Sequence, residues 1–285
     1  MNATQRRELL RSHLISSQCI QPASVFDPIS ARLASFLGLD IGMMAGSVAS
    51  AVIAGAPDIT MITLTELAEQ SRRITRTSDI SLIVDADHGY GNALNVMRTV
   101  QELENANVSA LTIEDTLLPQ TFGNQGDSLI SINEATGKFR AALHARTDPS
   151  TVIIGRTSAM ETEGITGTVK RSQAYSATGI DALFFTKITT LEQLEAIHAS
   201  TKLPIFLGSA PAILRDPALL ARNGVRISIQ GHLPFQNMVL ELYNSIRQQT
   251  HLDETANAPT LSQAEIIATT LSSEEYTVWQ RTFMQ

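Results

Sequence analysis

Short apolar runs alternate with segments of helical periodicity along most of the 285-residue chain. Because alternating strands and helices build parallel sheets, and continuous apolar runs are typical of strands covered on both faces, the pattern predicts parallel strands with helices packed outside them. The predicted strands are Ala23–Phe26, Ile41–Ala45, Ser81–Asp85, Ala110–Glu114, Val152–Arg156, Ala182–Thr186, Pro204–Leu207 and Val225–Gln230.

The number of strands decides between two architectures. Eight strand–helix units favour a closed barrel, which typically needs about 250 residues, over an open doubly wound sheet. The open sheet stays an alternative, because counting strands in a sequence does not exclude it. We therefore predict one (β/α)8 TIM-barrel domain over residues 1–285, with an N-terminal helix and extra C-terminal helices. Functional side chains of such barrels gather at the C-terminal ends of the strands.

Two segments exceed what the barrel needs. Thr116–Ser131 is too long for an ordinary connection after the fourth strand, and we interpret it as an active-site lid. After a helix at Phe235–Thr250 and a polar linker at 251–260, Leu261–Gln285 carries an apolar stripe. We expect the extension at 251–285 to pack on a neighbouring subunit of a homo-oligomer, a tetramer or dimer of dimers.

Composition narrows the class of protein. A net charge of −7 argues against a nucleic-acid partner, whose phosphates select basic surfaces. The lone Cys19 excludes an intramolecular disulfide and fits a reducing compartment. The uncharged stretch Ile41–Pro57 is shorter than the roughly 20 apolar residues of a membrane span, and the N-terminus lacks a signal-peptide pattern. We expect a cytoplasmic protein without a membrane partner.

Acidic residues cluster at the ends of the third and fourth strands. Asp85 and Asp87 are spaced i, i+2 and precede a glycine-rich turn, while Glu114 ends the next strand, about 4.8 Å away in a sheet. Alternatively, Asp85 is an ordinary strand-end acid and Asp87 caps a helix. Three such acids would repel one another strongly without a cation, and oxygen ligands suit Mg²⁺ or Mn²⁺. We therefore predict a divalent metal at Asp85, Asp87 and Glu114.

Other strand ends offer groups that bind anions. Gly46, Ser47 and Val48 follow the second strand and could present backbone N–H groups and a hydroxyl to a carboxylate, although a close-packed turn is the alternative. Arg156 ends an otherwise apolar strand, where an unpaired charge is expensive to bury. We interpret it as a clamp for a substrate carboxylate; a structural ion pair with Glu114 is the alternative.

His232 follows the eighth strand and faces the same mouth of the predicted barrel. A lone histidine is more often structural, so a role in substrate binding or catalysis depends on its neighbours. The sequence contains no G-x-S-x-G elbow, no P-loop and no cluster of histidine and cysteine with metal-ligand spacing. The acid cluster therefore remains the strongest chemical feature of the chain.

Together these motifs resemble the phosphoenolpyruvate mutase/isocitrate lyase superfamily. The resemblance covers nearly the whole chain, and within the superfamily the oxaloacetate decarboxylase branch is most similar. It rests on FDPISARLA, GSVAS, PDITMITLTE, DADHGYGN, TIEDTLLPQ, GRT and the GH after the eighth strand. The resemblance implies that Asp85 ligates Mg²⁺ directly, that Asp87 and Glu114 hold its water ligands, and that Asp58 supports these waters from nearby.

The resemblance also implies roles in substrate binding. Ser47 and its neighbouring amides would take the substrate carboxylate, Arg156 would lie against an α-keto acid, and His232 would face its distal end. The implied reaction is Mg²⁺-dependent decarboxylation of oxaloacetate to pyruvate and CO₂ through a metal-stabilised enolate. His232 would orient the departing carboxylate or assist protonation of the enolate, and the sequence leaves both roles open.

Other reactions of the superfamily stay as alternatives. The lid lacks the catalytic cysteine of the isocitrate and methylisocitrate lyases, and Asn124 alone does not make the lid of the phosphonate mutases. Ser158 and the segment GSAPAILRD depart from the close decarboxylases at the active-site mouth. A C–C or C–P lyase acting on another small α-keto acid, of methylisocitrate or phosphonopyruvate type, is therefore the alternative. An inactive keto-acid-binding protein is a further one.

Overall fold

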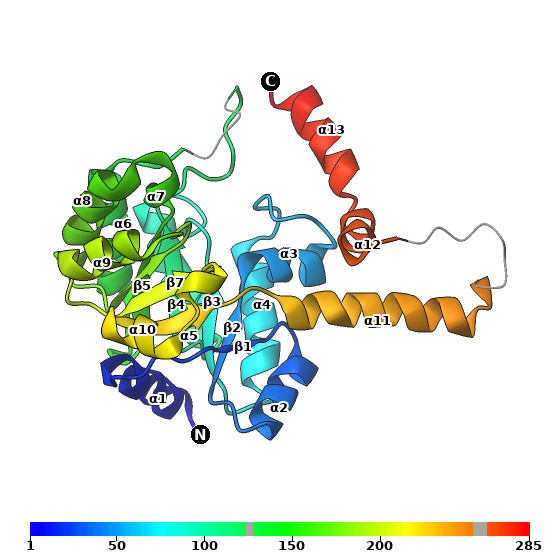
Figure 1. Cartoon of the computed structure of the whole chain (residues 1–285), viewed down its shortest axis with the longest axis horizontal. Coiled ribbons are helices and arrows are strands. Elements are labelled where there is room, and N and C mark those ends of the chain that lie inside the picture. Colours follow the sequence, from blue (N-terminus) through cyan, green and yellow to red (C-terminus); the bar gives the residue numbers. More distant parts are fainter. Residues whose placement is uncertain (124–127, 253–260) are drawn as a thin grey trace.

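The computed structural model describes residues 1–123, 128–252 and 261–285. Eight parallel strands follow one another in sequence order within one curled sheet (Figure 1). They are β1 (Ala23–Ser24), β2 (Ile41–Met44), β3 (Ser81–Asp85), β4 (Ala110–Glu114), β5 (Val152–Thr157), β6 (Ala182–Phe185), β7 (Ile205–Gly208) and β8 (Val225–Ile229). Each lies within two residues of its predicted bounds.

A parallel bridge joins the two edges of this sheet. Ile20, just before β1, pairs with Ile227 of β8, and the backbone N–H of Ser228 donates to the Ile20 carbonyl at 2.9 Å. The strand order and this bridge confirm the predicted (β/α)8-like barrel, and the sequential order is not that of a doubly wound sheet.

Helices follow the strands as the periodicity predicts. Several begin at a capping box, in which the first side chain accepts from a backbone N–H three residues later, as Thr63 does from Glu66 at α4. The helices are α1 (Ala3–Ile15), α2 (Pro28–Phe36), α3 (Gly46–Ala54), α4 (Leu64–Thr75), α5 (Ala93–Asn105), α6 (Ile132–Ala145), α7 (Ala159–Thr162), α8 (Gly164–Ser176), α9 (Leu191–Ser200), α10 (Pro217–Arg222), α11 (Leu233–Gln249), α12 (Gln263–Thr270) and α13 (Ser273–Phe283), with a 3₁₀ turn at Ala212–Leu214.

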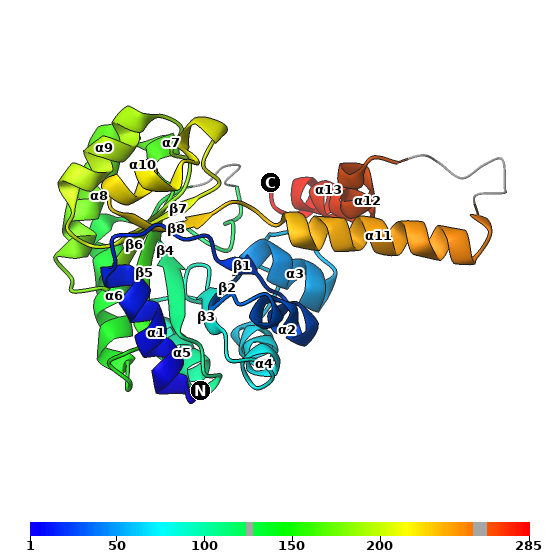
Figure 2. The same ribbon diagram turned by 60° about the horizontal axis from the view of Figure 1, so that its bottom comes forward.

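The predicted N-terminal helix lies against the barrel and fills one end of its interior (Figure 2). Leu10 and Leu14 of α1 pack among inward-facing strand residues, including Ile41 and Val152, the first residues of β2 and β5. Burying each leucine is worth about 1.5–3 kcal/mol. Because α1 covers the N-terminal ends of the strands, their C-terminal ends remain for a functional site.

The C-terminal helices do not cover the barrel as the others do. Figures 1 and 2 show α11 extending away from it, with α12 and α13 returning toward the loop after β4. Gln263 of α12 donates to Asn237 of α11 at 3.1 Å. Packing of residues 251–285 on a neighbouring subunit stays a prediction. Most of the predicted linker, residues 253–260, and residues 124–127 of the predicted lid lie outside the described residues.

Within the described part of the chain, no helix combines the length and apolar character that a membrane crossing requires.

Candidate active site

A cavity of about 540 Å³ opens at the C-terminal ends of the strands. Four of the predicted residues line it together: Asp58, Asp87, Glu114 and Arg156. The loop after β4 supplies another wall through residues 116–120, and Ser158 and Lys187 border it as well. The structure therefore brings these four residues together at this end of the barrel, and their functional roles stay predictions.

The turn after β3 brings its two acids toward β4. Asp85, the last residue of β3, accepts a hydrogen bond from the Thr112 hydroxyl at 2.8 Å. Asp87 adopts a left-handed backbone with φ of 45°, and its carbonyl accepts from the N–H of Glu114 at 2.8 Å. Gly89 permits this turn, because its φ is 80° and a Cβ atom would lie 2.4 Å from Val96.

Arg156 pairs with two of these acids. Its Nη1 atom lies 2.5 Å from Oδ2 of Asp85, and its Nε atom lies 3.2 Å from Oε2 of Glu114, the residue opposite it in the β4–β5 register. The guanidinium also stacks 5.4 Å from the centre of the Phe184 ring. The ion pair with Glu114, left open by the sequence, is present and extends to Asp85; the substrate clamp stays a prediction.

Negative charge exceeds positive charge in this group, which we call the Arg156 cluster: Arg156 with Asp58, Asp85, Asp87 and Glu114. Burial raises the pKa of Glu114 to about 7, although Arg156 opposes the shift. Burial, and then repulsion by Asp85 and Glu114, raises the pKa of Asp87 well above its usual range. The pKa of Asp58 is also raised, by burial and then by Asp85.

The Arg156 cluster fits a hard divalent cation in charge and in donor type. Every acidic member offers carboxylate oxygens, and a cation would offset their repulsion. Among the described residues, no three acidic, histidine or cysteine side chains already converge on one point. Mg²⁺ keeps several waters and takes only one or two carboxylates directly, so Asp85 as the direct ligand would suffice.

The predicted carboxylate-binding turn lies beside the acids. Gly46 begins α3, whose N-cap residue Ala45 forms no side-chain cap hydrogen bond. A Cβ atom on Gly46 would lie 2.8 Å from Oδ1 of Asp87 and 3.5 Å from Oδ2 of Asp85, so only glycine fits without displacement. Ser47 is half-buried beside it. Neither Gly46 nor Ser47 lines the 540 Å³ cavity itself, and their role in substrate binding stays a prediction.

Val48 lies on α3 and His232 lies at the start of α11. The Val48 side chain packs with Phe26 and Phe235, so only its backbone would serve a substrate. His232 is the N-cap residue of α11, and its Nδ1 atom is buried without a hydrogen-bond partner among the described residues. Burial lowers the pKa of His232 while the Asp85 charge opposes the shift, which favours a neutral imidazole. Neither residue lines the cavity.

The sequence interpretation missed several residues of the cavity, among them Lys187 and two from the C-terminal part of the chain. Gln280 and Met284, from the C-terminal part of the chain, line the same cavity as the acids. The Gln280 amide donates to Oε1 of Gln120 at 3.3 Å, and the Met284 carbonyl accepts from the N–H of Gly123 at 3.0 Å. No motif marks these residues, and the apolar stripe around them suggests a subunit contact instead.

A model of the family described as phosphoenolpyruvate phosphomutase matches residues 10–250. The chain belongs to this family. The match begins within α1 and ends after α11, so it covers the Arg156 cluster, while Gln280 and Met284 lie beyond it.

Curated relatives refine the family assignment and confirm the predicted resemblance. The chain is 54% identical to the oxaloacetate decarboxylase of Bradyrhizobium diazoefficiens over 242 residues, which cover 85% of this chain and 84% of the relative. It is 57% identical to the oxaloacetate decarboxylase of Rhodopseudomonas palustris strain BisB5 over 229 residues, covering 80% and 79%.

Solved structures share the fold over the whole chain. A phosphonopyruvate hydrolase in complex with oxalate and Mg²⁺ is 29% identical, with a TM-score of 0.76 and 100% of both chains covered. The phosphoenolpyruvate phosphomutase of Streptomyces platensis subsp. rosaceus is 25% identical, with a TM-score of 0.78 and the same coverage. A Mg²⁺ ion is therefore held by at least one solved protein of this fold.

Proposed function

We propose that this chain is an oxaloacetate decarboxylase, a carboxy-lyase that converts oxaloacetate into pyruvate and CO₂ with Mg²⁺, for which Mn²⁺ can substitute. The observation that carries the proposal is the acid-rich Arg156 cluster at the cavity of a chain more than half identical to oxaloacetate decarboxylases. The decisive chemistry is stabilisation of the negative charge that develops on the keto oxygen as the bond to the departing carboxylate breaks.

The acidic residues would hold the metal. Asp85 is the proposed direct ligand, with Asp87 and Glu114 on water ligands and Asp58 behind them. Thr112 supports this assignment, because its hydroxyl fixes one oxygen of Asp85 at 2.8 Å and leaves the orientation of the carboxylate defined. When bound, Mg²⁺ would supply a Lewis acid that stabilises the enolate of pyruvate.

The other residues would bind and orient oxaloacetate. The first N–H groups of α3, at Gly46, Ser47 and Val48, lack a side-chain cap and would bind the C1 carboxylate. Arg156 would neutralise part of the enolate charge. Its position above Phe184 and between two carboxylates holds the guanidinium in place before substrate enters.

His232 would act at the C4 end of the substrate. Its buried imidazole is favoured in the neutral form, which has one N–H donor and one acceptor nitrogen. A neutral ring can donate a hydrogen bond to the departing carboxylate and can also pass a proton to the enolate carbon. Either role would make the rate of decarboxylation depend on His232, and the His232→Ala variant measures that dependence.

Pyruvate formation from oxaloacetate with Mg²⁺ tests the proposal. Asp85→Ala should lower the rate to that of Mg²⁺ alone, and His232→Ala should lower it by about 100-fold, the scale of lost acid–base or positioning help. Asp40→Ala and His144→Ala are matched controls, because both residues are exposed, and Asp40 precedes β2 at the opposite end of the barrel. Full rates in Asp85→Ala and His232→Ala would contradict the assignment.

The lyase alternatives stay open to the same assay. Ser158 borders the cavity, so the departure from the decarboxylase pattern lies where a substrate would bind. A panel of oxaloacetate, 2-methylisocitrate and phosphonopyruvate separates decarboxylation from C–C and C–P cleavage. Tight Mg²⁺-dependent oxalate binding without turnover of any panel member would instead favour a keto-acid-binding protein.

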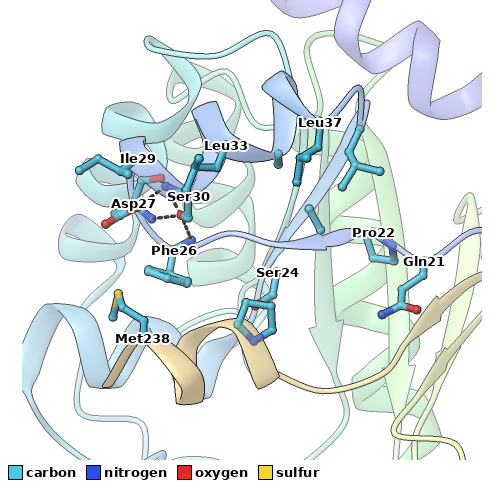
Figure 3. Close-up of a pocket in the computed structure, with 14 residues that line it drawn as sticks. Gln21, Pro22, Ser24, Phe26, Asp27, Ile29, Ser30, Leu33, Leu37 and Met238 are labelled. Atoms are coloured by element: carbon cyan, nitrogen blue, oxygen red, sulfur yellow. Dashed lines mark hydrogen bonds between the residues drawn. The ribbon is translucent and has the colours of Figure 1, made fainter. Parts of the chain in front are cut away.

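We also propose a cytoplasmic homo-oligomer, a tetramer or dimer of dimers. An apolar groove of about 580 Å³ lies between α2, β1 and the start of α11, as Figure 3 shows around Leu33, Leu37 and Met238. Leu37 is 71% exposed, and Leu242 on the projecting α11 is 57% exposed. A second copy would cover this surface, with residues 251–285 contributing. Light scattering of the protein in solution would measure the subunit number.

A further inference from the structure

A second arginine–carboxylate group lies directly behind the wall of the active site. We call it the Arg171 cluster: Arg171, Asp115, Thr157, Glu163 and Tyr175. Asp115 is fully buried, and its Oδ2 atom accepts from the Tyr175 hydroxyl at 2.6 Å, from the Thr157 hydroxyl at 2.8 Å and from Nη1 of Arg171 at 3.1 Å. The other edge of Arg171 binds Glu163 through two hydrogen bonds, at 2.9 and 2.6 Å.

The Arg171 cluster is joined to the active site through the backbone of two strands. Asp115 follows Glu114 and Thr157 follows Arg156, and neighbouring residues of a strand point to opposite faces. Glu114 and Arg156 therefore face the cavity while Asp115 and Thr157 face α8. The N–H of Asp115 also donates to the Arg156 carbonyl at 3.2 Å. A shift of Asp115 would move both cavity residues.

The same cluster binds Ile130, the residue at which the loop after β4 returns to the barrel. The N–H of Ile130 donates to the Asp115 carbonyl at 2.8 Å, and the Ile130 carbonyl accepts from Nη1 of Arg171 at 3.0 Å. Next to it, Thr116 and Leu129 form an antiparallel bridge, which makes the base of the loop a short ribbon. Both backbone polar groups of Ile130 are thus fixed by the cluster.

We propose that the Arg171 cluster is a positioning device for the reaction: it fixes Glu114, Arg156 and the base of the loop relative to one another. The inference rests on the proposed function. Catalytic groups must be held to within roughly 0.5 Å, and partners of metal-site residues typically change activity or metal affinity by about 10–100-fold when removed. A buried ion pair contributes little net stability compared with apolar packing, so stability alone is a weak reason for this arrangement.

Single hydroxyl deletions test the proposal with little change in shape. Thr157→Val is nearly isosteric and loses the bond to Asp115 together with the one that the hydroxyl accepts from the N–H of Ala159, whereas Thr157→Ser keeps both. Tyr175→Phe loses the bond to Asp115 and the one accepted from Arg171, but it keeps the ring that packs edge-on against Phe139 at 4.9 Å. The matched control is Tyr243→Phe, whose hydroxyl accepts from Arg247 on α11, the helix that projects from the barrel.

Four readouts are compared across these variants: kcat, KM, Mn²⁺ affinity by electron paramagnetic resonance, and amide exchange at Ile130. We expect Thr157→Val and Tyr175→Phe to lower kcat or Mn²⁺ affinity by about 10-fold or more and to speed exchange at Ile130. Thr157→Ser should restore all of these values, and Tyr243→Phe should leave them unchanged.

Two outcomes separate failure of the inference from failure of the proposed function. If Thr157→Val and Tyr175→Phe lower Tm but keep kcat and Mn²⁺ affinity within twofold of wild type, the cluster is merely structural and the inference is wrong. If wild type itself does not decarboxylate oxaloacetate, the proposed function fails. In that case Mn²⁺ affinity and exchange at Ile130 still decide whether the cluster positions the site.

Discussion

Arg156 and Arg171 lie on opposite sides of the C-terminal ends of β4 and β5, and the charges around the two arginines differ. Arg156 faces a cavity among four carboxylates, and the pKa of Glu114 there is raised to about 7 because burial outweighs its ion pair. Arg171 faces inward between Asp115 and Glu163, and its hydrogen bonds lower the pKa of Glu163. The Arg156 cluster has one arginine for four carboxylates, an excess of negative charge that a cation would offset. The Arg171 cluster has one arginine for two carboxylates, both bonded to it, which suits the proposed positioning role.

The largest expected difference between the two clusters is their need for a metal. Removing divalent cations with EDTA should lower decarboxylation by wild type more than about 100-fold, because several kcal/mol of charge stabilisation at the keto oxygen is lost. Added Mg²⁺ should restore the rate, measured as pyruvate formed per minute. If the enzyme keeps its full rate in EDTA, the excess of carboxylates around Arg156 does not serve to bind a metal for the reaction.

Replacing Arg171 should have the largest effect on stability. Arg171→Met leaves the fully buried Asp115 without its cationic partner, so we expect a loss of about 3–5 kcal/mol in the free energy of unfolding. Urea unfolding monitored by circular dichroism would measure it. Arg140→Met, at an exposed position of α6, is the matched control and should change stability by less than about 0.5 kcal/mol. A loss in Arg171→Met no larger than that in Arg140→Met would contradict the stabilising role of the Arg171–Asp115 pair.

The sequence predicted the cavity face of these strands better than the opposite face. Asp85, Glu114 and Arg156 are strand-end residues with polar side chains after apolar runs, and the period of the barrel brings such positions together. The partners of Asp115 are not visible in the same way, since Arg171 is 56 residues away on α8. Its place in the helix is that of an ordinary polar residue, and only tertiary packing determines which acid it reaches.

The C-terminal wall of the cavity was beyond sequence reasoning for a similar reason. Gln280 and Gln120 are 160 residues apart, and neither belongs to a motif with a chemical requirement. Of the apolar stripe in this segment, Ile266 is buried while Trp279 and Phe283 are exposed, so the predicted burial of the stripe against a neighbouring subunit stays a prediction. Gln280 borders the acids because of the path that the chain takes through α11 and α12, and no local sequence pattern predicts that path.

Removing one acid should have opposite effects in the two clusters. Asp87→Asn takes away a buried charge that is repelled by Asp85 and Glu114, so the metal-free protein should become more stable by about 1 kcal/mol. Asp115→Asn should destabilise the protein, because Arg171 loses a buried anionic partner. Thermal unfolding in EDTA measures both. Destabilisation by Asp87→Asn without metal would show that the charge of Asp87 is compensated within the Arg156 cluster even when no cation is bound.

The smallest expected effect concerns the outer edge of the Arg171 cluster. The Glu163 side chain is 35% exposed, so Glu163→Gln should lower stability at pH 7 by less than about 1 kcal/mol. Because the folded protein lowers the pKa of Glu163, its contribution is present above the ordinary carboxyl pKa of 4.5 and is lost as pH falls through the folded value.

The difference in unfolding free energy between wild type and Glu163→Gln should therefore stay constant from pH 8 to about pH 6 and shrink below about pH 4, near the usual titration range of carboxylates. Glu161→Gln is the matched control, since the Glu161 side chain is 49% exposed and pairs with the exposed Lys187 outside both clusters. A difference that instead grows toward acid pH would mean that Arg171 does not hold Glu163 in its ionised form, and the outer edge of the cluster would then carry no charge pair.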